Sequence, residues 1–196
     1  SEQFYQAVLT RDARFDGHFF TAVKTTGIYC RPVCKVRVPL AKNCLFFLSA
    51  ALAESNGFRP CLRCRPELAP HVLPNWSIQD ASQILALQAA QLIDKSVAVN
   101  DTSLTISSFA ERLGISERHY SRIFKQHICV SPFQYRQTRR LLLAKQLLGD
   151  TTLPIQLISK LSGFASQRRL NTVFAAQYKL TPSACRKGIQ SARHAN

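Results

Sequence analysis

GIYCRPVCKVR (residues 27–37) and GFRPCLRCRPE (residues 57–67) are the two segments that decide how the first part of this chain folds. They hold a C-x3-C pair and a C-x2-C pair, formed by Cys30, Cys34, Cys61 and Cys64. Two short-spaced cysteine pairs can converge as four thiolates around a tetrahedral zinc ion. The spacing therefore predicts a Zn²⁺ site that staples a small domain over residues 1–70, whose own core is thin.

The rest of this first domain favours a mixed α+β fold. Two short helices are expected, and the second ends at the helix stop Asn56-Gly57. Apolar β-prone runs lie between them, and a proline-bearing segment that follows the cysteines reads as a linker. The expected helices are Phe4–Leu9 and Ser49–Ser55, the strands Phe19–Lys24 and Cys44–Leu48, and the linker Pro66–Pro74.

Beyond the linker, the sequence changes to long amphipathic helices and then to an internal repeat. Residues 71–103 combine a linker with a connecting helix, whose apolar stripe is Ile78, Ile84, Leu85, Leu87, Leu92 and Ile93. Residues 104–196 carry the repeat, in which a glycine turn precedes a serine-capped helix and a Ser/Thr-Pro helix start. The matching positions are Ser116 and Ser166, Phe124 and Phe174, and Pro132 and Pro182. This layout predicts an all-α domain with two helix-turn-helix units, joined by a helix from Pro132 to Leu148 that Gly149 ends.

The second helix of each unit is expected to enter the major groove of DNA. These helices are predicted at Glu117–Lys125 and Gln167–Phe174. Arginine, glutamine and asparagine make paired hydrogen bonds to guanine and adenine edges. A plain helical bundle with solvated charges is the alternative. The side chains expected to contact DNA are Arg118, His119, Arg122, Gln167, Arg168, Arg169 and Asn171.

Charge and composition agree with a nucleic-acid partner. The chain has 26 Lys and Arg against 11 Asp and Glu, a net charge of +15, while 46% of its residues are hydrophobic. A folded chain with this balance usually binds a polyanion, and no apolar run is long enough to span a membrane. Seven cysteines, an odd number, and an opening without a signal peptide favour the reducing cytoplasm. The three outside the zinc pattern, Cys44, Cys129 and Cys185, are expected to be small core residues.

Both parts of the chain resemble known families. IFKQHICVSPFQYRQTRRLLLAKQLL and ISKLSGFASQRRLNTVFAAQYKLTPSACRK resemble the AraC-type DNA-binding domain over about Asn75–Arg186. FDGHFFTAVKTTGIYCRPVCKVR and GFRPCLRCRPE resemble the N-terminal methyl-acceptor domain of the Ada DNA-repair family. The two domains in this order are the architecture of the Ada family, so the resemblance covers nearly the whole chain.

The resemblance implies a self-inactivating methyltransferase. Its methyl acceptor would be Cys30, which takes the methyl group of a backbone methylphosphotriester while also being a zinc ligand with Cys34, Cys61 and Cys64. Positive charge and alignment around the sulfur would serve the departing phosphate. Residues at the family's backbone-contacting positions are Thr26, Arg37 and Arg63, and Asp16 would orient an arginine or cap a turn.

The resemblance further implies a transcription activator of the alkylation response that binds methylated DNA and promoter sites. Methylation of Cys30 lowers the negative charge of the zinc site by one unit, so affinity for DNA is expected to rise. We expect a monomer, with RNA polymerase as a further partner. The alternatives are a transcription factor whose zinc is purely structural, and a fragment of a fusion with a DNA glycosylase or an alkylguanine acceptor domain.

Overall fold

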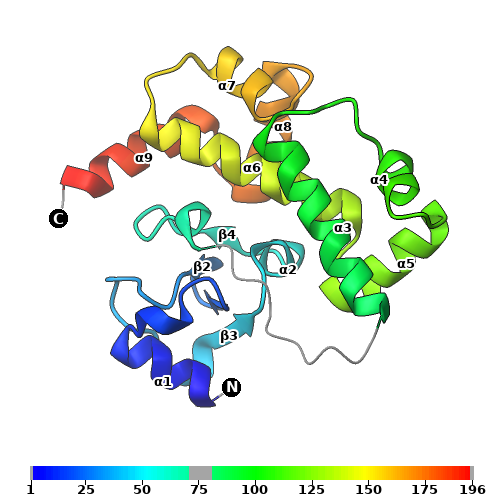
Figure 1. Ribbon diagram of the computed structural model, residues 1–196. Coiled ribbons are helices and arrows are strands. Elements are labelled where there is room, and N and C mark those ends of the chain that lie inside the picture. The colour runs from blue at the N-terminus through cyan, green and yellow to red at the C-terminus, as the bar shows by residue number, and fades with distance from the viewer. Residues whose placement is uncertain (1, 71–80, 195–196) are drawn as a thin grey trace.

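The computed structural model describes residues 2–70 and 81–194, which form two parts joined along one long helix (Figure 1). Residues 2–70 contain a four-stranded sheet of order β3-β1-β2-β4 with short helices around it. The predicted α+β domain is therefore confirmed. Its elements are α1 (Glu2–Thr10), η1 (Ala13–Phe15), β1 (Phe20–Val23), β2 (Ile28–Cys30), η2 (Ala41–Asn43), β3 (Cys44–Phe47), α2 (Ala50–Ser55), β4 (Arg59–Pro60) and η3 (Pro66–Leu68).

The pairing of β2 with β4 brings the two cysteine pairs together. Strand β1 runs antiparallel to both β2 and β3, whereas β2 and β4 are parallel, with Tyr29 opposite Pro60. Cys30 ends β2 and Cys61 directly follows β4, and the Cys61 amide donates to the Tyr29 carbonyl at 3.0 Å. Because parallel strands end at the same edge of a sheet, the first cysteine of each pair reaches one corner of the domain.

Residues 81–194 fold into the predicted pair of helix-turn-helix units at the two ends of α6 (Figure 1). The serine caps hold as expected, because Ser116 accepts from the His119 amide and Ser166 from the Arg169 amide. Gly114 and Gly163 adopt positive φ at the turns before them. The helices are α3 (Ala81–Ala98), α4 (Ile106–Arg112), α5 (Glu117–Ile128), α6 (Pro132–Asp150), α7 (Ile155–Leu161), α8 (Gln167–Tyr178) and α9 (Pro182–His194).

Two details of the predicted connections are wrong. Helix α6 does not end at Gly149 but runs to Asp150, and Gly149 is buried in it. Its missing side chain makes room for the other domain, since a Cβ there would lie 3.0 Å from the Arg65 guanidinium. Pro66–Leu68 forms η3 instead of a linker, and η3 packs on α6. The last four residues of the expected linker, 71–74, and Ile78 of the apolar stripe lie outside the described residues.

The two parts of the chain are packed against each other. Ala51 of α2 belongs to the core formed by α3, α4, α5 and α6, and Leu62, which directly follows Cys61, packs on the core around α8 and α9. In α9, a Cβ on Gly188 would lie only 2.8 Å from Leu62. Helices α6 and α9 thus each carry a glycine where the loop of Cys61 and Cys64 approaches.

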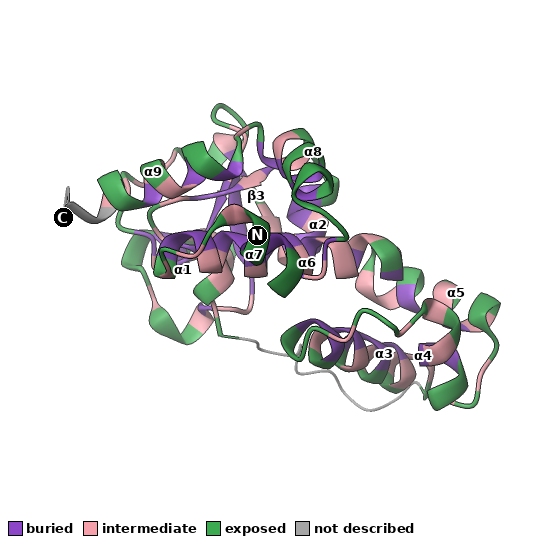
Figure 2. Ribbon diagram, turned by 90° about the horizontal axis from the view of Figure 1, so that it is seen from above, coloured by how far each residue is buried: buried purple, intermediate pink, exposed green. Residues whose placement is uncertain are grey.

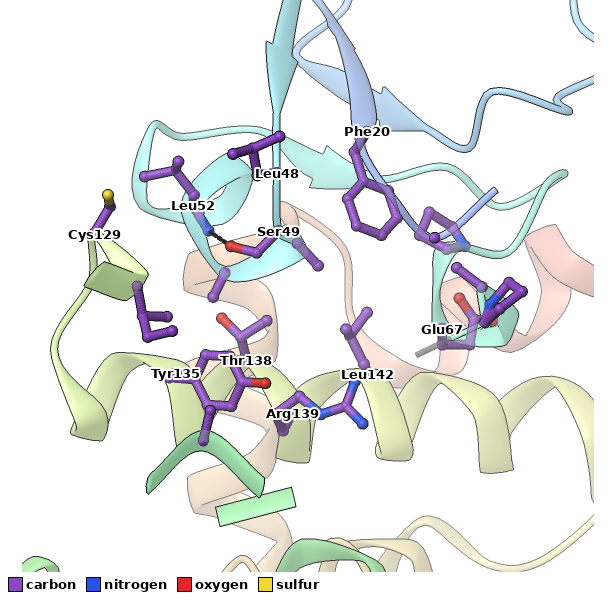
Figure 3. A pocket seen from close by; sticks show the side chains of 18 of the residues that line it. Phe20, Leu48, Ser49, Leu52, Glu67, Cys129, Tyr135, Thr138, Arg139 and Leu142 are labelled. Carbon is purple, nitrogen blue, oxygen red and sulfur yellow. Dashed lines mark hydrogen bonds between the residues drawn. The ribbon is translucent and has the colours of Figure 1, made fainter. Parts of the chain in front are cut away.

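A cavity of about 150 Å³ lies at this junction, beside the first helix-turn-helix unit. Figure 3 shows Thr138 and Leu142 of α6 on one side of this cavity, with α2 and Phe20 on the other. Buried residues occur in both parts of the chain, in the sheet domain and along the helices (Figure 2). Among the described helices, none is both long and apolar enough to cross a lipid bilayer.

The lone cysteines follow the core prediction in two cases of three. Cys44 and Cys185 are buried, at 8% and 1% exposure. Cys129 is exposed, so its assignment to the core is wrong. It terminates α5 in the left-handed conformation, with φ of 64°, and this turn points its side chain away from the helix core.

Candidate metal centre and nucleic-acid interface

The four cysteines of the sequence pattern meet in space. Their Sγ atoms all lie within 4.8 Å of one another, at the corner where β2 and β4 end. Three are almost fully buried, with Cys30, Cys34 and Cys61 exposed by 8%, 7% and 6%, and Cys64 is somewhat more open. Four sulfurs gathered this closely can surround one ion with four short metal–sulfur bonds.

As four thiolates, this cluster would need a compensating cation. The neighbouring sulfurs, first of all Cys34, together with burial raise the pKa of the Cys30 thiol. Four closely packed sulfurs cannot all ionise side by side unless positive charge offsets their repulsion. A soft, four-thiolate set selects Zn²⁺ among the common divalent ions. The residues present therefore fit zinc, and Cys30, Cys34, Cys61 and Cys64 would hold it.

An ion pair beside the sulfurs orients Arg31. The Arg31 guanidinium donates to both carboxylate oxygens of Asp16, one through Nε at 2.9 Å, and to the Cys64 carbonyl at 3.2 Å. The Arg31 amide also donates to Cys64 Sγ at 3.4 Å. Both roles expected for Asp16 are present, because its carboxylate orients Arg31 and its backbone amide caps η1 by donating to the Ala13 carbonyl at 3.1 Å. The Asp16 carboxylate is the principal cause that raises the pKa of Arg31, which keeps a fixed positive charge at the site.

The three residues predicted to contact a DNA backbone near the sulfurs are all exposed. Thr26 lies in the turn between β1 and β2, where its hydroxyl faces the Val23 carbonyl at 3.4 Å. Arg37 follows the first cysteine pair by three residues, and Arg63 lies between Cys61 and Cys64. Their exposure leaves both guanidinium groups available to a phosphate.

The predicted DNA-reading side chains line the starts of α5 and α8. Arg118 and Arg122 are exposed on α5, and His119 is half-buried, with Nδ1 3.0 Å from Arg122 Nη2. On α8 all four predicted residues are exposed: Gln167, Arg168, Arg169 and Asn171. The opposite faces of both helices are buried through residues such as Phe124 and Phe174. The structure thus places each predicted set on the solvent side of its helix.

Comparison with known proteins gives the same division of the chain. Residues 3–67 match the family model described as the metal binding domain of Ada, and residues 109–188 match a helix-turn-helix domain. The bifunctional transcriptional activator/DNA repair enzyme AdaA of Bacillus subtilis is 32% identical over 187 residues, which cover 95% of this chain and 83% of that protein. The chain belongs to the Ada family.

Two further matches show how this Ada-family chain relates to longer and shorter proteins. The probable bifunctional transcriptional activator/DNA repair enzyme AlkA of Mycobacterium tuberculosis is 37% identical over 94% of this chain. The match covers only 36% of that relative, so the chain spans about a third of its length. The C-terminal domain of AraT from Geobacillus stearothermophilus has a TM-score of 0.50 at 30% identity, covering 57% of this chain and 88% of that domain.

The Ada-family chain also contains a buried network of polar side chains between its two domains, which the sequence did not predict. Glu54 of α2 is 5% exposed, and its carboxylate accepts from Tyr29 at 3.0 Å, Tyr178 at 3.0 Å and Thr138 at 2.8 Å. Its carbonyl accepts from Gln177 at 2.9 Å. Burial raises the pKa of Glu54 to about 7, although these hydrogen bonds and the nearby Lys145 act against the rise.

A second buried contact lies directly after the metal ligands. The Glu67 carboxylate accepts from Lys145 Nζ of α6 at 2.5 Å, and these side chains are 1% and 0% exposed. Arg65 bridges Glu67, at 3.0 Å, and Asp150 at the end of α6, at 2.5 Å. A lone glutamate in ALAES and a lone lysine in LLLAKQLL were the available signals, because each interrupts an otherwise apolar helix face.

Proposed function

We propose that this chain is a stoichiometric methylphosphotriester-DNA methyltransferase that also regulates transcription of the alkylation response. The observation that carries the proposal is the gathering of four sulfurs beside an oriented arginine, in a chain that also presents two basic helices for DNA. The Bacillus subtilis relative is named both a transcriptional activator and a DNA repair enzyme, which agrees with both halves of the proposal.

The reaction we propose is an in-line displacement at the methyl carbon of a phosphotriester. The Cys30 sulfur forms a bond to that carbon as the carbon–oxygen bond breaks, and the electron pair of the broken bond leaves with the phosphodiester oxygen. No proton moves, because the departing phosphodiester is a stable anion. Bound Zn²⁺ supplies a deprotonated sulfur at neutral pH. Arg37 and Arg63 hold the phosphate and stabilise its returning charge, while Thr26 helps to position the backbone.

The assignment of the acceptor to Cys30 rests on the family motif, since burial does not separate Cys30 from Cys34 and Cys61. The Arg31 amide donates to Cys64 Sγ at 3.4 Å. An amide hydrogen bond withdraws negative charge from a thiolate, so Cys64 is the weaker nucleophile. Cys30 also occupies the position that accepts the methyl group in the resembling family.

Mass spectrometry tests the methyl transfer. We expect the zinc-loaded chain, incubated with duplex DNA carrying one methylphosphotriester, to gain one methyl group, and fragment spectra to place it on Cys30. Cys44→Ala, which removes a buried cysteine outside the site, should gain the methyl as the unchanged chain does. A folded, zinc-loaded chain that gains no methyl would leave the transcription factor with a structural zinc as the better reading.

Regulation would follow from the charge change. Methylation removes one negative charge from the four sulfurs, which lessens their repulsion of a phosphate backbone. We expect the methylated chain to bind promoter DNA at least about tenfold more tightly at low salt, with the difference shrinking as salt rises. Fluorescence anisotropy with matched methylated and unmethylated samples measures this. Equal affinities at every salt concentration would contradict the regulatory half and leave the repair half standing.

The sequence of the two recognition helices supports direct reading of bases, with Arg118, His119 and Arg122 in one half-site and Gln167, Arg168, Arg169 and Asn171 in the other. The chain would act as a monomer in the reducing cytoplasm, with RNA polymerase as the partner through which it activates.

A further inference from the structure

We infer that the metal domain (residues 2–70) structurally supports the second recognition helix, α8. Gain or loss of metal at the four cysteines would then change the stability of α8, which carries DNA-reading residues, through the contacts of Glu54 and Glu67. The inference requires metal binding by the four cysteines and is independent of methyl transfer. It goes beyond the proposed function, in which the two domains could act merely side by side.

The first set of hydrogen bonds links β2, which ends at the metal ligand Cys30, to α8 through a single carboxylate. Tyr29, the neighbour of Cys30 on β2, is fully buried and donates to the Glu54 carboxylate. The same carboxylate accepts from Tyr178 at the end of α8 and from Thr138 on α6. A buried carboxylate with three hydroxyl donors holds all three elements in one geometry, because an unpaired hydroxyl in such a place is costly.

The second connection starts at the other cysteine pair. Arg65 follows Cys64 directly, adopts a positive φ of 53°, and reaches Asp150 at the end of α6. Glu67 is paired with the buried Lys145 one turn earlier in the same helix. The glycines Gly149 and Gly188 let the loop of this cysteine pair approach α6 and α9 closely. When the loop loses its metal and its shape, these contacts lose their geometry as well.

Contacts with the first helix-turn-helix unit are of a different kind. There α2 contributes Ala51 and Leu52 to an apolar core, and the cavity of about 150 Å³ lies beside them. Helix α4 of that unit packs on α3 and α5. Apolar contacts tolerate small shifts better than a buried hydrogen-bond network does, so the polar links make α8 more sensitive than α4 to changes in the metal domain.

Hydrogen exchange followed by mass spectrometry tests the inference on the full chain. We expect that removing zinc with EDTA speeds exchange of the α8 amides by about tenfold or more, while exchange in α4 changes by less than about threefold. Unchanged exchange in α8, or an equal change in α4 and α8, would overturn the inference. Both results are independent of whether Cys30 accepts a methyl group.

A matched pair of variants on the helical side separates the network from general loss of structure. Thr138→Val with Tyr178→Phe removes two hydroxyls that donate to Glu54, and Tyr135→Phe removes a hydroxyl of α6 that donates to Asp94 of α3. In the zinc-loaded chain we expect about tenfold faster α8 exchange in the double variant and less than about twofold change there in Tyr135→Phe. Equal α8 exchange in the two proteins would count against the network as the link.

Discussion

Removal of zinc is expected to unfold residues 2–70 while leaving the first helix-turn-helix unit folded. The metal domain has small cores, one around Tyr29 and Phe58 and another around Phe19, so it lacks the apolar burial to stand without its metal. Structural zinc contributes about 10–16 kcal/mol to the folding of small zinc domains at neutral pH. We expect one zinc per chain by native mass spectrometry, and loss of protected amides in residues 2–70 after chelation.

Single ligand variants should have the same consequence. Cys34→Ala leaves three sulfurs, which hold zinc less tightly and leave the metal domain partly or wholly unfolded. Cys44→Ala is the matched control, because Cys44 is equally buried but lies in β3, away from the four sulfurs. It should lose no zinc and only about 1 kcal/mol of unfolding free energy. A metal domain that keeps its protected amides without zinc would contradict the prediction that zinc stabilises this domain. A Cys34→Ala chain that retains full zinc affinity would contradict it as well.

Lys145→Met is expected to lower the unfolding free energy of the zinc-loaded chain by about 3 kcal/mol. The Lys145 ammonium is completely buried against Glu67, whose side chain is only 1% exposed. Without the lysine, the Glu67 carboxylate keeps Arg65 alone, and Arg65 is also bound to Asp150. Removing one member of a buried ion pair costs more than the pair contributes, because the remaining charge stays out of water.

Urea unfolding followed by circular dichroism measures this loss. Lys160→Met is the matched control, since Lys160 is exposed on α7 and its replacement should change the free energy by less than about 0.5 kcal/mol. Adding Glu67→Gln to Lys145→Met should recover part of the lost stability, because it removes the stranded charge. If Lys145→Met and Lys160→Met unfold at the same urea concentration, the buried pair does not hold the domains together.

Much of the fold was predictable because its signals are local. The cysteine spacing identified the metal cluster, and the serine caps with their following helices identified both helix-turn-helix units. The pairing of β2 with β4 was not predictable, because a strand as short as Arg59–Pro60 has no periodicity of its own. Within the site, the FDG motif anticipated that Asp16 could orient an arginine, and the structure identifies that arginine as Arg31.

The junction between the domains was missed for a different reason. Tyr178 and Glu54 are 124 residues apart, and Lys145 and Glu67 are 78 apart. Glu54 and Lys145 each interrupt an apolar helix face, which indicates burial, but such a position does not identify a partner in a distant domain. The prediction for Gly149 was wrong because a glycine near the end of a helix usually terminates it, whereas here Arg65 and Ile189 both lie close to the position that a Cβ would take.

The two glycines inside helices give a way to sort relatives of this chain. Glycine in a helix interior costs about 1 kcal/mol relative to alanine, so it is retained where a side chain would obstruct something. Here Gly149 faces Arg65 and Gly188 faces Leu62. Leu62 and Arg65 lie on either side of Cys64 in the sequence. An Ada-family sequence with glycine at both positions would be expected to dock its cysteine loop on these helices, whereas bulky residues at both would indicate two domains free to move independently on DNA.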